Sequence, residues 1–406
     1  MTKDSAADGR LTLGLAFSCF AAQGIANGML GVAWPSIRAT FGLSLDVLVV
    51  LFISSTIGYL IGSIMAGRAM NQLGIGRSLL IGNLVAAAGF FGYALSPGWW
   101  IMVVLAILVG WTSGSIGASL NIFVAATRTV RAMNWMHAMY GVGATIGPLI
   151  MTAAIGSRFG WRLGYMVAGA IHLTLALLFL TVVDRMNFRG MPVSLDRNGV
   201  KNTASPAATL RLPIVLLGIT LYLLYTGVET TAGQWSFSLF TEERSMSLYL
   251  AGISTSIYWG MLTLGRILFG AVANRIGINR LLRYSMAGAV LSAALLLIPT
   301  PSAGIISLAL MGLSLSAIFP TLMSDTPNRV GAAHVSSAIG FQTGASSLGL
   351  ALLPGVAGVL AARLGLEVIG FYLVLASSLM LITNEVAIHL AHRNRMSADS
   401  LVNSGS

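Results

Sequence analysis

The chain has 406 residues, of which 56% are hydrophobic and only 9% are charged. A soluble globular domain carries about 25% charged residues, so this chain has too few polar side chains to cover a water-facing surface, and its natural solvent is lipid. The single cysteine, Cys19, excludes an internal disulfide framework and a Cys-based metal site. The net charge of +11 would suggest nucleic acid in a soluble protein, but here the positive charge lies in short loops and indicates topology instead.

Twelve apolar segments follow one another along the chain, each long enough to cross a hydrocarbon core. The first begins at Leu11 and is too long for the core of a signal peptide, so we expect it to persist as a membrane helix. Most loops are very short, which forces neighbouring helices to run antiparallel. The predicted spans are 12–33, 47–66, 78–97, 99–125, 135–156, 163–183, 213–239, 247–270, 284–299, 304–323, 335–358 and 368–390.

The turns after the second and eighth spans share an eleven-residue pattern, which occurs twice at an offset of 203 positions. Each copy follows a long apolar run and precedes another. A polar turn repeated in this way predicts two copies of one membrane unit, which is a mark of transporters whose substrate path lies between the halves. The two copies are Gly67-x-x-x-Asn71-x-x-Gly74-Ile75-x-Arg77 and Gly270-x-x-x-Asn274-x-x-Gly277-Ile278-x-Arg280.

The longest polar stretch runs from Asp184 to Pro213 and separates the two halves of the span list. We therefore predict an N-terminal six-helix bundle at 1–184, a cytoplasmic linker at 185–212 and a C-terminal six-helix bundle at 213–406. If the N-terminus is cytoplasmic, 18 of the 23 lysines and arginines fall on the cytoplasmic side, which places both termini there. The short loops favour a bacterial inner membrane.

The repeated turn resembles the signature loop between the second and third helices of the major facilitator superfamily, Gly-x-x-x-Asp-Arg/Lys-x-Gly-Arg-Arg/Lys. In this chain Asn71 and Asn274 stand at the acidic position, while Arg275 keeps the basic position that follows it. The resemblance implies a twelve-helix fold of two pseudo-symmetric bundles and a gating role for the loop residues. Those residues are Gly67, Asn71, Gly74, Arg77, Gly270, Asn274, Arg275, Gly277 and Arg280.

Further local patterns resemble the fucose–proton symporter-like branch of that superfamily, which contains sugar permeases. The branch has carboxylates in spans one and four that serve sugar and proton. Here the corresponding stretches offer Gln23, Asn27 and Asn121 instead, so the first half supports neither fucose nor proton coupling. The similar strings are Tyr225-x-Gly227-x-Glu229-x-x-x-Gly233-x-Trp235, Met133-Asn134-x-x-His137-x-x-Tyr140-Gly141-x-Gly143-Ala144, Ile318-Phe319-Pro320-Thr321-Leu322 and Ile339-Gly340-Phe341-Gln342.

Glu229 lies near the middle of the seventh span. A carboxylate in a bilayer is costly and usually faces a bundle interior or a watery cavity. In such surroundings it can take up and release a proton near neutral pH. Tyr222 and Tyr225 share its helix face and form an aromatic wall that suits a sugar ring or a cation. The alternative is a glutamate hydrogen-bonded to a neighbouring helix.

Neutral amides and hydroxyls in the other spans can donate and accept at once, which suits hydroxyl-rich ligands. Their alternative role is hydrogen bonding between helices, which contributes about 0.6 kcal/mol per residue in lipid. We expect the set to line a cavity. Its members are Gln23 and Asn27 in span one, Asn121 in span four, and Gln342 and Ser346 in span eleven.

Three further residues have two open interpretations each. His137 starts span five and is either a proton relay or a helix-orienting group. Arg266, one turn inside span eight, either pairs with a carboxylate or extends to the surface, and we expect a structural or gating role. Trp235 is either a stacking residue for the substrate or an interface anchor.

No sequence motif supports an enzyme, a cofactor, ATP binding or a metal site. The sequence predicts a monomeric secondary transporter in which two bundles rock around a central cavity. We expect the substrate to be a small polar solute, first a monosaccharide or derivative, and protons to couple through Glu229. The alternatives are a proton-coupled exporter of amphipathic drugs or lipids, and a non-transporting membrane sensor.

Overall fold

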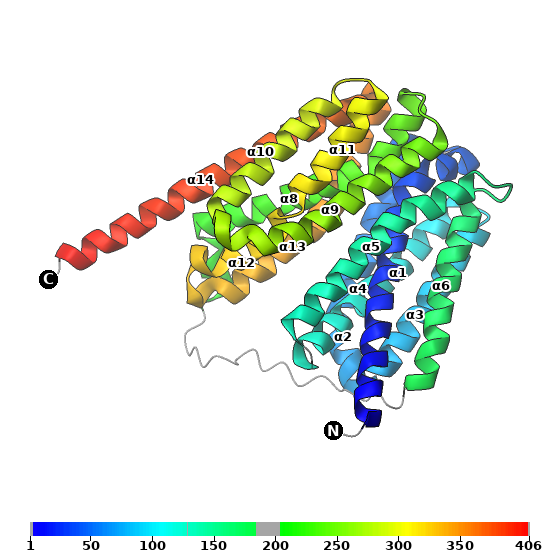
Figure 1. The fold of residues 1–406 in the computed structure, drawn as a ribbon, viewed down its shortest axis with the longest axis horizontal. Helices are drawn as coiled ribbons and strands as arrows, with labels where there is room; N and C mark the ends of the chain where they lie inside the picture. Colours follow the sequence, from blue (N-terminus) through cyan, green and yellow to red (C-terminus); the bar gives the residue numbers. More distant parts are fainter. Residues whose placement is uncertain (1–2, 128, 184–203, 405–406) are drawn as a thin grey trace.

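The computed structural model describes residues 3–127, 129–183 and 204–404, with side chains described outside 3–10, 130, 270–274 and 392–404. Every regular element in these ranges is helical, which confirms the predicted all-α membrane fold (Figure 1). Ten segments are long and apolar enough to span a bilayer. The other two long helices of the described chain are α9 (Leu248–Ile276) and α10 (Ile278–Leu296), which complete the predicted set of twelve.

The helices before the predicted linker are α1 (Lys3–Phe41), α2 (Leu48–Leu73), α3 (Ile75–Leu95), α4 (Trp99–Thr127), α5 (Val130–Ile155) and α6 (Trp161–Val182). After it come α8 (Pro213–Ser238), α9, α10, α11 (Pro301–Leu315), α12 (Ile318–Val330), α13 (Val335–Leu364) and α14 (Val368–Ser404). Short elements are η1 (Leu45–Val47), α7 (Pro206–Leu210), the π-helical turn η2 (Leu239–Glu243) and η3 (Ala332–His334).

The tenth predicted span is divided in the structure. Helix α11 ends at Leu315, and α12 begins at Ile318. Proline has no backbone N–H, and its ring clashes with the carbonyl four residues earlier. Pro320 therefore opposes a regular helix at Ser316, which is where the division lies. Just after the division, the centroid of the Phe319 ring lies 5.3 Å from that of Tyr222 and 5.9 Å from that of Tyr225.

The same order of helix pairing occurs in both halves of the chain. In the first half α1 packs on α5, α2 on α4 and α3 on α6. In the second half α8 packs on α13, α9 on α11 and α10 on α14. Close approach depends on small residues: a Cβ on Gly143 of α5 would overlap the carbonyl oxygen of Ala21 in α1. The internal repeat in the sequence therefore corresponds to the same pattern of helix pairing in both halves.

The repeated sequence pattern forms the same turn twice. Gly74 joins α2 to α3 with φ +79° and ψ 163°, and Gly277 joins α9 to α10 with φ +84° and ψ 141°. Only glycine adopts this region without strain, because it has no Cβ. Each glycine carbonyl then accepts the N–H four residues on, from Ser78 and Leu281 respectively.

The predicted linker is partly described. Residues 185–203 lie outside the described ranges, whereas α7 belongs to the described part of the linker. This part packs on the turn between α12 and α13, where the N–H of Ala204 donates to the Ala333 carbonyl oxygen at 3.0 Å. Thr209 Oγ1 and His334 Nδ1 are 2.8 Å apart. The proposed domain boundaries and the side of the membrane on which the termini lie stay predictions.

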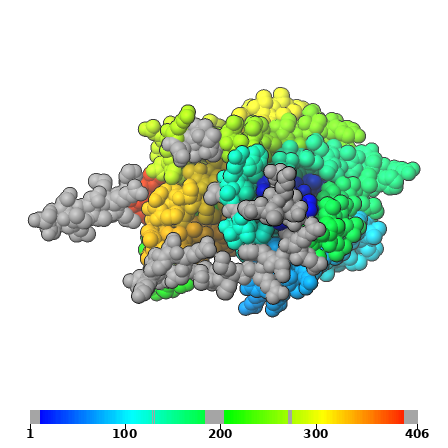
Figure 2. All heavy atoms as spheres, turned by 60° about the horizontal axis from the view of Figure 1, so that its bottom comes forward, coloured from blue at the N-terminus to red at the C-terminus, as the bar shows by residue number. Residues whose placement is uncertain are grey.

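The two halves of the chain meet at one end. We call this the Arg38 end, because Arg38 at the end of α1 forms an ion pair with Glu242 of η2 at 2.6 Å. At the same end, Gly355 of α13 lies against Val49 of α2. The halves diverge toward the opposite end, where the chain starts (Figure 1) and which is turned toward the viewer in Figure 2. We call it the Gly74 end.

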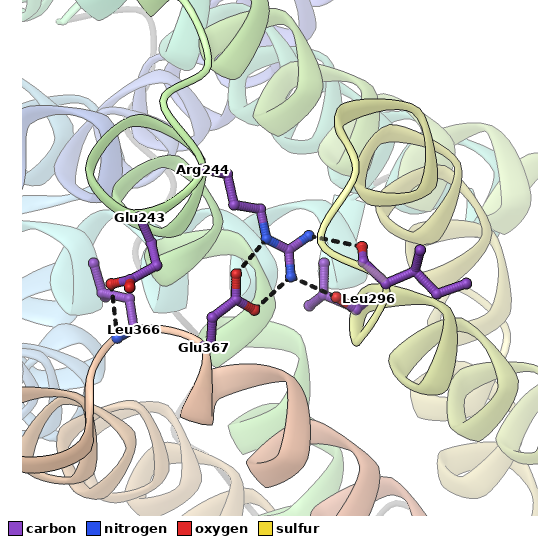
Figure 3. Close-up of polar contacts among 6 residues, drawn as sticks. Glu243, Arg244, Leu296, Leu366 and Glu367 are labelled. Atoms are coloured by element: carbon purple, nitrogen blue, oxygen red, sulfur yellow. Dashed lines mark hydrogen bonds and ion pairs between the residues drawn. The ribbon is translucent and has the colours of Figure 1, made fainter.

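The second half has a charged anchor of its own at the Arg38 end (Figure 3). The Arg244 guanidinium donates to both carboxylate oxygens of Glu367, at 2.7 and 2.6 Å. It also donates to the carbonyl oxygens of Leu296 and Ile298 where α10 ends. One buried arginine therefore fixes the end of α8 to α10 and to the start of α14.

Candidate substrate site

Glu229 of α8 faces Arg266 of α9 near the middle of both helices. Glu229 Oε1 and Arg266 Nη2 are 3.5 Å apart, and their side chains are 17% and 32% exposed. The hydroxyl of Tyr258 donates to the backbone carbonyl oxygen of Glu229 at 2.7 Å, which ties α8 to α9 at this level. Of the two interpretations left open for Arg266, the structure shows the pairing with a carboxylate.

Two tyrosines of α8 stand beside this pair. Tyr225 is buried, and its hydroxyl lies next to Glu229 and Arg266, within reach of both side chains. Tyr222, one turn away, has its hydroxyl near Thr326 of α12. The predicted aromatic wall exists, but its rings pack against Phe319 of α12. Both tyrosines are 1% exposed, so their rings contribute to helix packing in this structure.

Three of the predicted residues in the first half come together from separate helices. His137 Nε2 of α5 is 3.1 Å from Asn121 Oδ1 of α4. Asn121 also donates to the carbonyl oxygen of Gly117. The amide oxygen of Gln23 in α1 is 3.8 Å from the position that a Cβ on Gly117 would occupy. The amide nitrogen of Gln23 is buried without a partner. His137 is exposed and packs edge-on against Phe20, with ring centroids 5.2 Å apart.

Asn27 lies where the first half meets the second. Its side chain is exposed, and its backbone carbonyl oxygen accepts a hydrogen bond from Gln234 of α8 at 3.3 Å. Gly31, one turn on, lies against the Gln234 backbone. Sequence reasoning missed Gln234, although an amide in the middle of an apolar span is a detectable signal. This contact joins α1 to α8 just toward the Arg38 end from Glu229.

Three predicted residues of the second half are buried in packing between helices. Gln342 of α13 accepts a hydrogen bond from Thr326 of α12 at 3.0 Å, and its amide nitrogen lies against Gly218 of α8. Ser346 is buried, and its hydroxyl has no partner. Trp235 is fully buried and donates to the carbonyl oxygen of Pro354 at 2.9 Å. These contacts match the helix-joining alternative considered for the amides.

The predicted gating residues other than Arg266 belong to the two repeated turns at the Gly74 end. Asn71, Arg77, Arg275 and Arg280 are exposed there, and a Cβ on Gly67 would meet open space. The side chains of Gly270 and Asn274 are outside the described set, so a neutral latch between the two turns stays a prediction. Among the residues that the structure describes, no cluster of His, Cys, Asp and Glu could hold a metal ion.

Contacts between α5 and α9 lead from the Arg38 end toward the Glu229–Arg266 pair. From the Arg38 end they run through Thr152 with Gly252 and Thr145 with Gly260 to Gly141 with Thr263. One turn further, His137 is exposed and lies within electrostatic range of Arg266. Polar groups of both halves therefore lie close to each other at the level of this pair.

Comparison with known proteins agrees with this architecture. The sequence model of the Major Facilitator Superfamily matches residues 16–354. The glucose/mannose transporter GlcP of Bacillus subtilis is 24% identical over 328 residues, which cover 78% of this chain and 79% of that protein. The putative glucose/galactose transporter of Helicobacter pylori is 21% identical over 368 residues, covering 86% of this chain and 88% of that protein. The crystal structure of the nucleoside transporter NupG matches 93% of this chain and 98% of its own, with a TM-score of 0.73 and 14% identity, so this likeness concerns the fold alone.

Proposed function

We propose that this chain, which belongs to the Major Facilitator Superfamily and is a multi-pass membrane transporter, carries a monosaccharide or monosaccharide derivative with proton coupling through Glu229. Two similar proteins are named as a glucose/mannose and a putative glucose/galactose transporter, which supports a sugar substrate. The amides of Gln23 and Asn121 beside His137 add donors and acceptors suited to hydroxyl groups. Family membership disfavours the non-transporting sensor.

The proposed transport cycle is a rocking of one half against the other. The halves touch at the Arg38 end and are apart at the Gly74 end, as expected for one of the two states of alternating access. We further propose that the Gly74 end and both termini face the cytoplasm, in a bacterial inner membrane, and that the transporter works as a monomer.

The single observation that carries this proposal is the position of the Glu229–Arg266 pair. Both groups are ionisable, lie within the apolar region and stay partly exposed, and His137 and Tyr140 of α5 lie within electrostatic range of Arg266. Intramembrane charges at such a place usually mark a substrate or ion path. A proton on Glu229 removes its attraction for Arg266, so protonation changes the contact between α8 and α9.

The test is uptake of labelled glucose and glucuronate, two sugars that differ at C6, into liposomes with an imposed pH gradient. We expect Glu229→Gln to abolish uptake driven by the gradient while exchange between internal and external sugar continues, because the amide cannot titrate. The matched control is Glu385→Gln, which removes an exposed ion pair with Arg283 at 2.6 Å far from the site. Gradient-driven uptake that is equal in Glu229→Gln and the unmodified protein would show that this role is wrong.

A further inference from the structure

We infer that the substrate is an acidic monosaccharide derivative, whose carboxylate binds Arg266 while Glu229 carries a proton. This inference rests on the proposed sugar-transport function and narrows its substrate class to sugar acids. In this scheme Glu229 and the substrate carboxylate compete for the guanidinium of Arg266. Protonation of Glu229 leaves the guanidinium free to bind the substrate.

The Glu229–Arg266 pair is looser than the other ion pairs in the described part of the chain. Its shortest distance is 3.5 Å, whereas Arg38–Glu242, Arg244–Glu367, Arg283–Glu385 and Arg329–Asp325 each close to 2.6 Å. A guanidinium has five N–H donors and binds a carboxylate best through two parallel hydrogen bonds. Arg266 has donors that Glu229 does not engage, so it can bind a second carboxylate.

Charge balance favours an anionic substrate over a neutral one. When Glu229 takes up a proton, Arg266 keeps its positive charge, because a guanidinium does not deprotonate in proteins. An intramembrane cation without a counter-charge is costly. A neutral sugar cannot supply that charge, whereas a substrate carboxylate restores it. Proton uptake and substrate binding then favour each other.

The groups around the pair do not provide another anion. From α5 come His137 and Tyr140, from α8 Tyr225, and from α9 Tyr258. The tyrosines are neutral at physiological pH and histidine is neutral or cationic. Of the described groups that face Arg266, Glu229 alone carries a negative charge, so after its protonation the counter-charge must come from the substrate.

The surrounding polar atoms complement the rest of such a ligand. The buried Tyr225 hydroxyl lies beside Arg266, and in the first half the amide nitrogen of Gln23 is buried without a partner. Buried polar groups without partners are rare and call for an explanation. Together with Asn121 and His137 they can bind ring hydroxyls while Arg266 holds the carboxylate.

The experiment uses full-length protein in liposomes with two probes, D-glucuronate and D-glucose, which differ in a carboxylate against a hydroxymethyl group at C6. We expect half-saturation for glucuronate at a concentration roughly tenfold lower or more, since a charged hydrogen bond contributes about 1.5–3 kcal/mol. One proton and one carboxylate move together without net charge. A potassium-diffusion potential should therefore leave glucuronate uptake unchanged, whereas cotransport of a proton with a neutral sugar would respond to it.

Two variants separate binding from coupling. Glu229→Gln should keep the preference for glucuronate but make its binding independent of pH. The double variant Glu229→Gln with Arg266→Gln keeps the site uncharged and should lose the preference, and its thermal unfolding in detergent checks that it folds. Gradient-driven glucose uptake without a preference for glucuronate overturns the inference and leaves sugar transport standing. Failure to take up either sugar overturns the proposed sugar function as well, and a preference that survives the double variant overturns the role of Arg266.

Discussion

At the scale of single residues, Arg244 should matter more for stability than an exposed arginine with the same kind of partner. Its side chain is 2% exposed and donates hydrogen bonds to Glu367 and to two carbonyl oxygens at the end of α10. Arg244→Ala leaves those carbonyls without their donor. Because Glu367 is 37% exposed and regains water, we expect a loss of about 1–3 kcal/mol, below the cost of breaking a fully buried pair. Thermal unfolding in detergent measures it.

Arg283→Ala is the matched control, since Arg283 also donates to both oxygens of a glutamate, Glu385. Its side chain is 47% exposed, and exposed ion pairs contribute little to stability. We expect little or no change in its unfolding temperature. Equal losses in the two variants would mean that burial at Arg244 is not what makes its contacts stabilising.

The sequence singled out Glu229 but did not predict the surroundings of several other candidate residues, for a physical reason. A carboxylate in the middle of an apolar span is informative alone, so Glu229 was predictable. Its pairing with Arg266 was one of two options, because the rotation of α9 against α8 is set by packing across helices. The same limit applies to Trp235 and Gln342, whose side chains turn toward helix neighbours that no local pattern specifies.

At the scale of helices, the approach of α1 to α5 depends on glycine. A Cβ on Gly143 would overlap the Ala21 carbonyl oxygen, so Gly143→Ala must push the two helices apart. We expect a loss of about 1–3 kcal/mol, the usual range for overpacking. Gly340→Ala in α13 is the control, because its Cβ meets open space and alanine favours a helix. Unfolding temperatures that rank the other way would contradict this account of the contact.

Helix existence was easier to predict than helix limits. The lengths of the apolar segments predicted all twelve spans. Helix α1, however, runs from Lys3 to Phe41, whereas residues 12–33 were predicted. The prediction stopped before Pro35, which the helix includes. Neighbouring helices can support a proline within a membrane helix, and the adjacent Trp34 is fully buried. Pro320, in contrast, coincides with a division between α11 and α12. Local sequence does not distinguish these two outcomes.

At the scale of the whole molecule, the repeat in the sequence predicted two related halves but not how they are placed. The equivalent turns at Gly74 and Gly277 depend on local backbone conformation, because both residues have a positive φ that favours glycine. The contact of the halves at the Arg38 end depends on side chains 204 positions apart, Arg38 and Glu242, and an ion pair at such separation leaves no local signal. In the proposed rocking mechanism the same sequence must also allow the opposite state.

The Arg38–Glu242 pair should bias the molecule toward the state seen here. Arg38→Glu turns the attraction into repulsion, which favours opening of the Arg38 end and, in a rocking motion, closure of the Gly74 end. Partly exposed pairs contribute about 0.2–1 kcal/mol, so we expect the ratio of the two states to shift by roughly two- to fivefold. Spin labels on cysteines introduced at Gly67 and Gly340, which both face open space, would report a shorter distance.

The single native cysteine, Cys19, is fully buried and should not compete for the label. The double exchange Arg38→Glu with Glu242→Arg restores the attraction and should return the distance distribution to that of the unmodified protein. Recovery in the double variant separates the ion pair from a general disturbance at the end of α1. A distribution that stays the same in Arg38→Glu would mean that apolar contacts, such as Val49 against Gly355, hold this end closed without help from the charges.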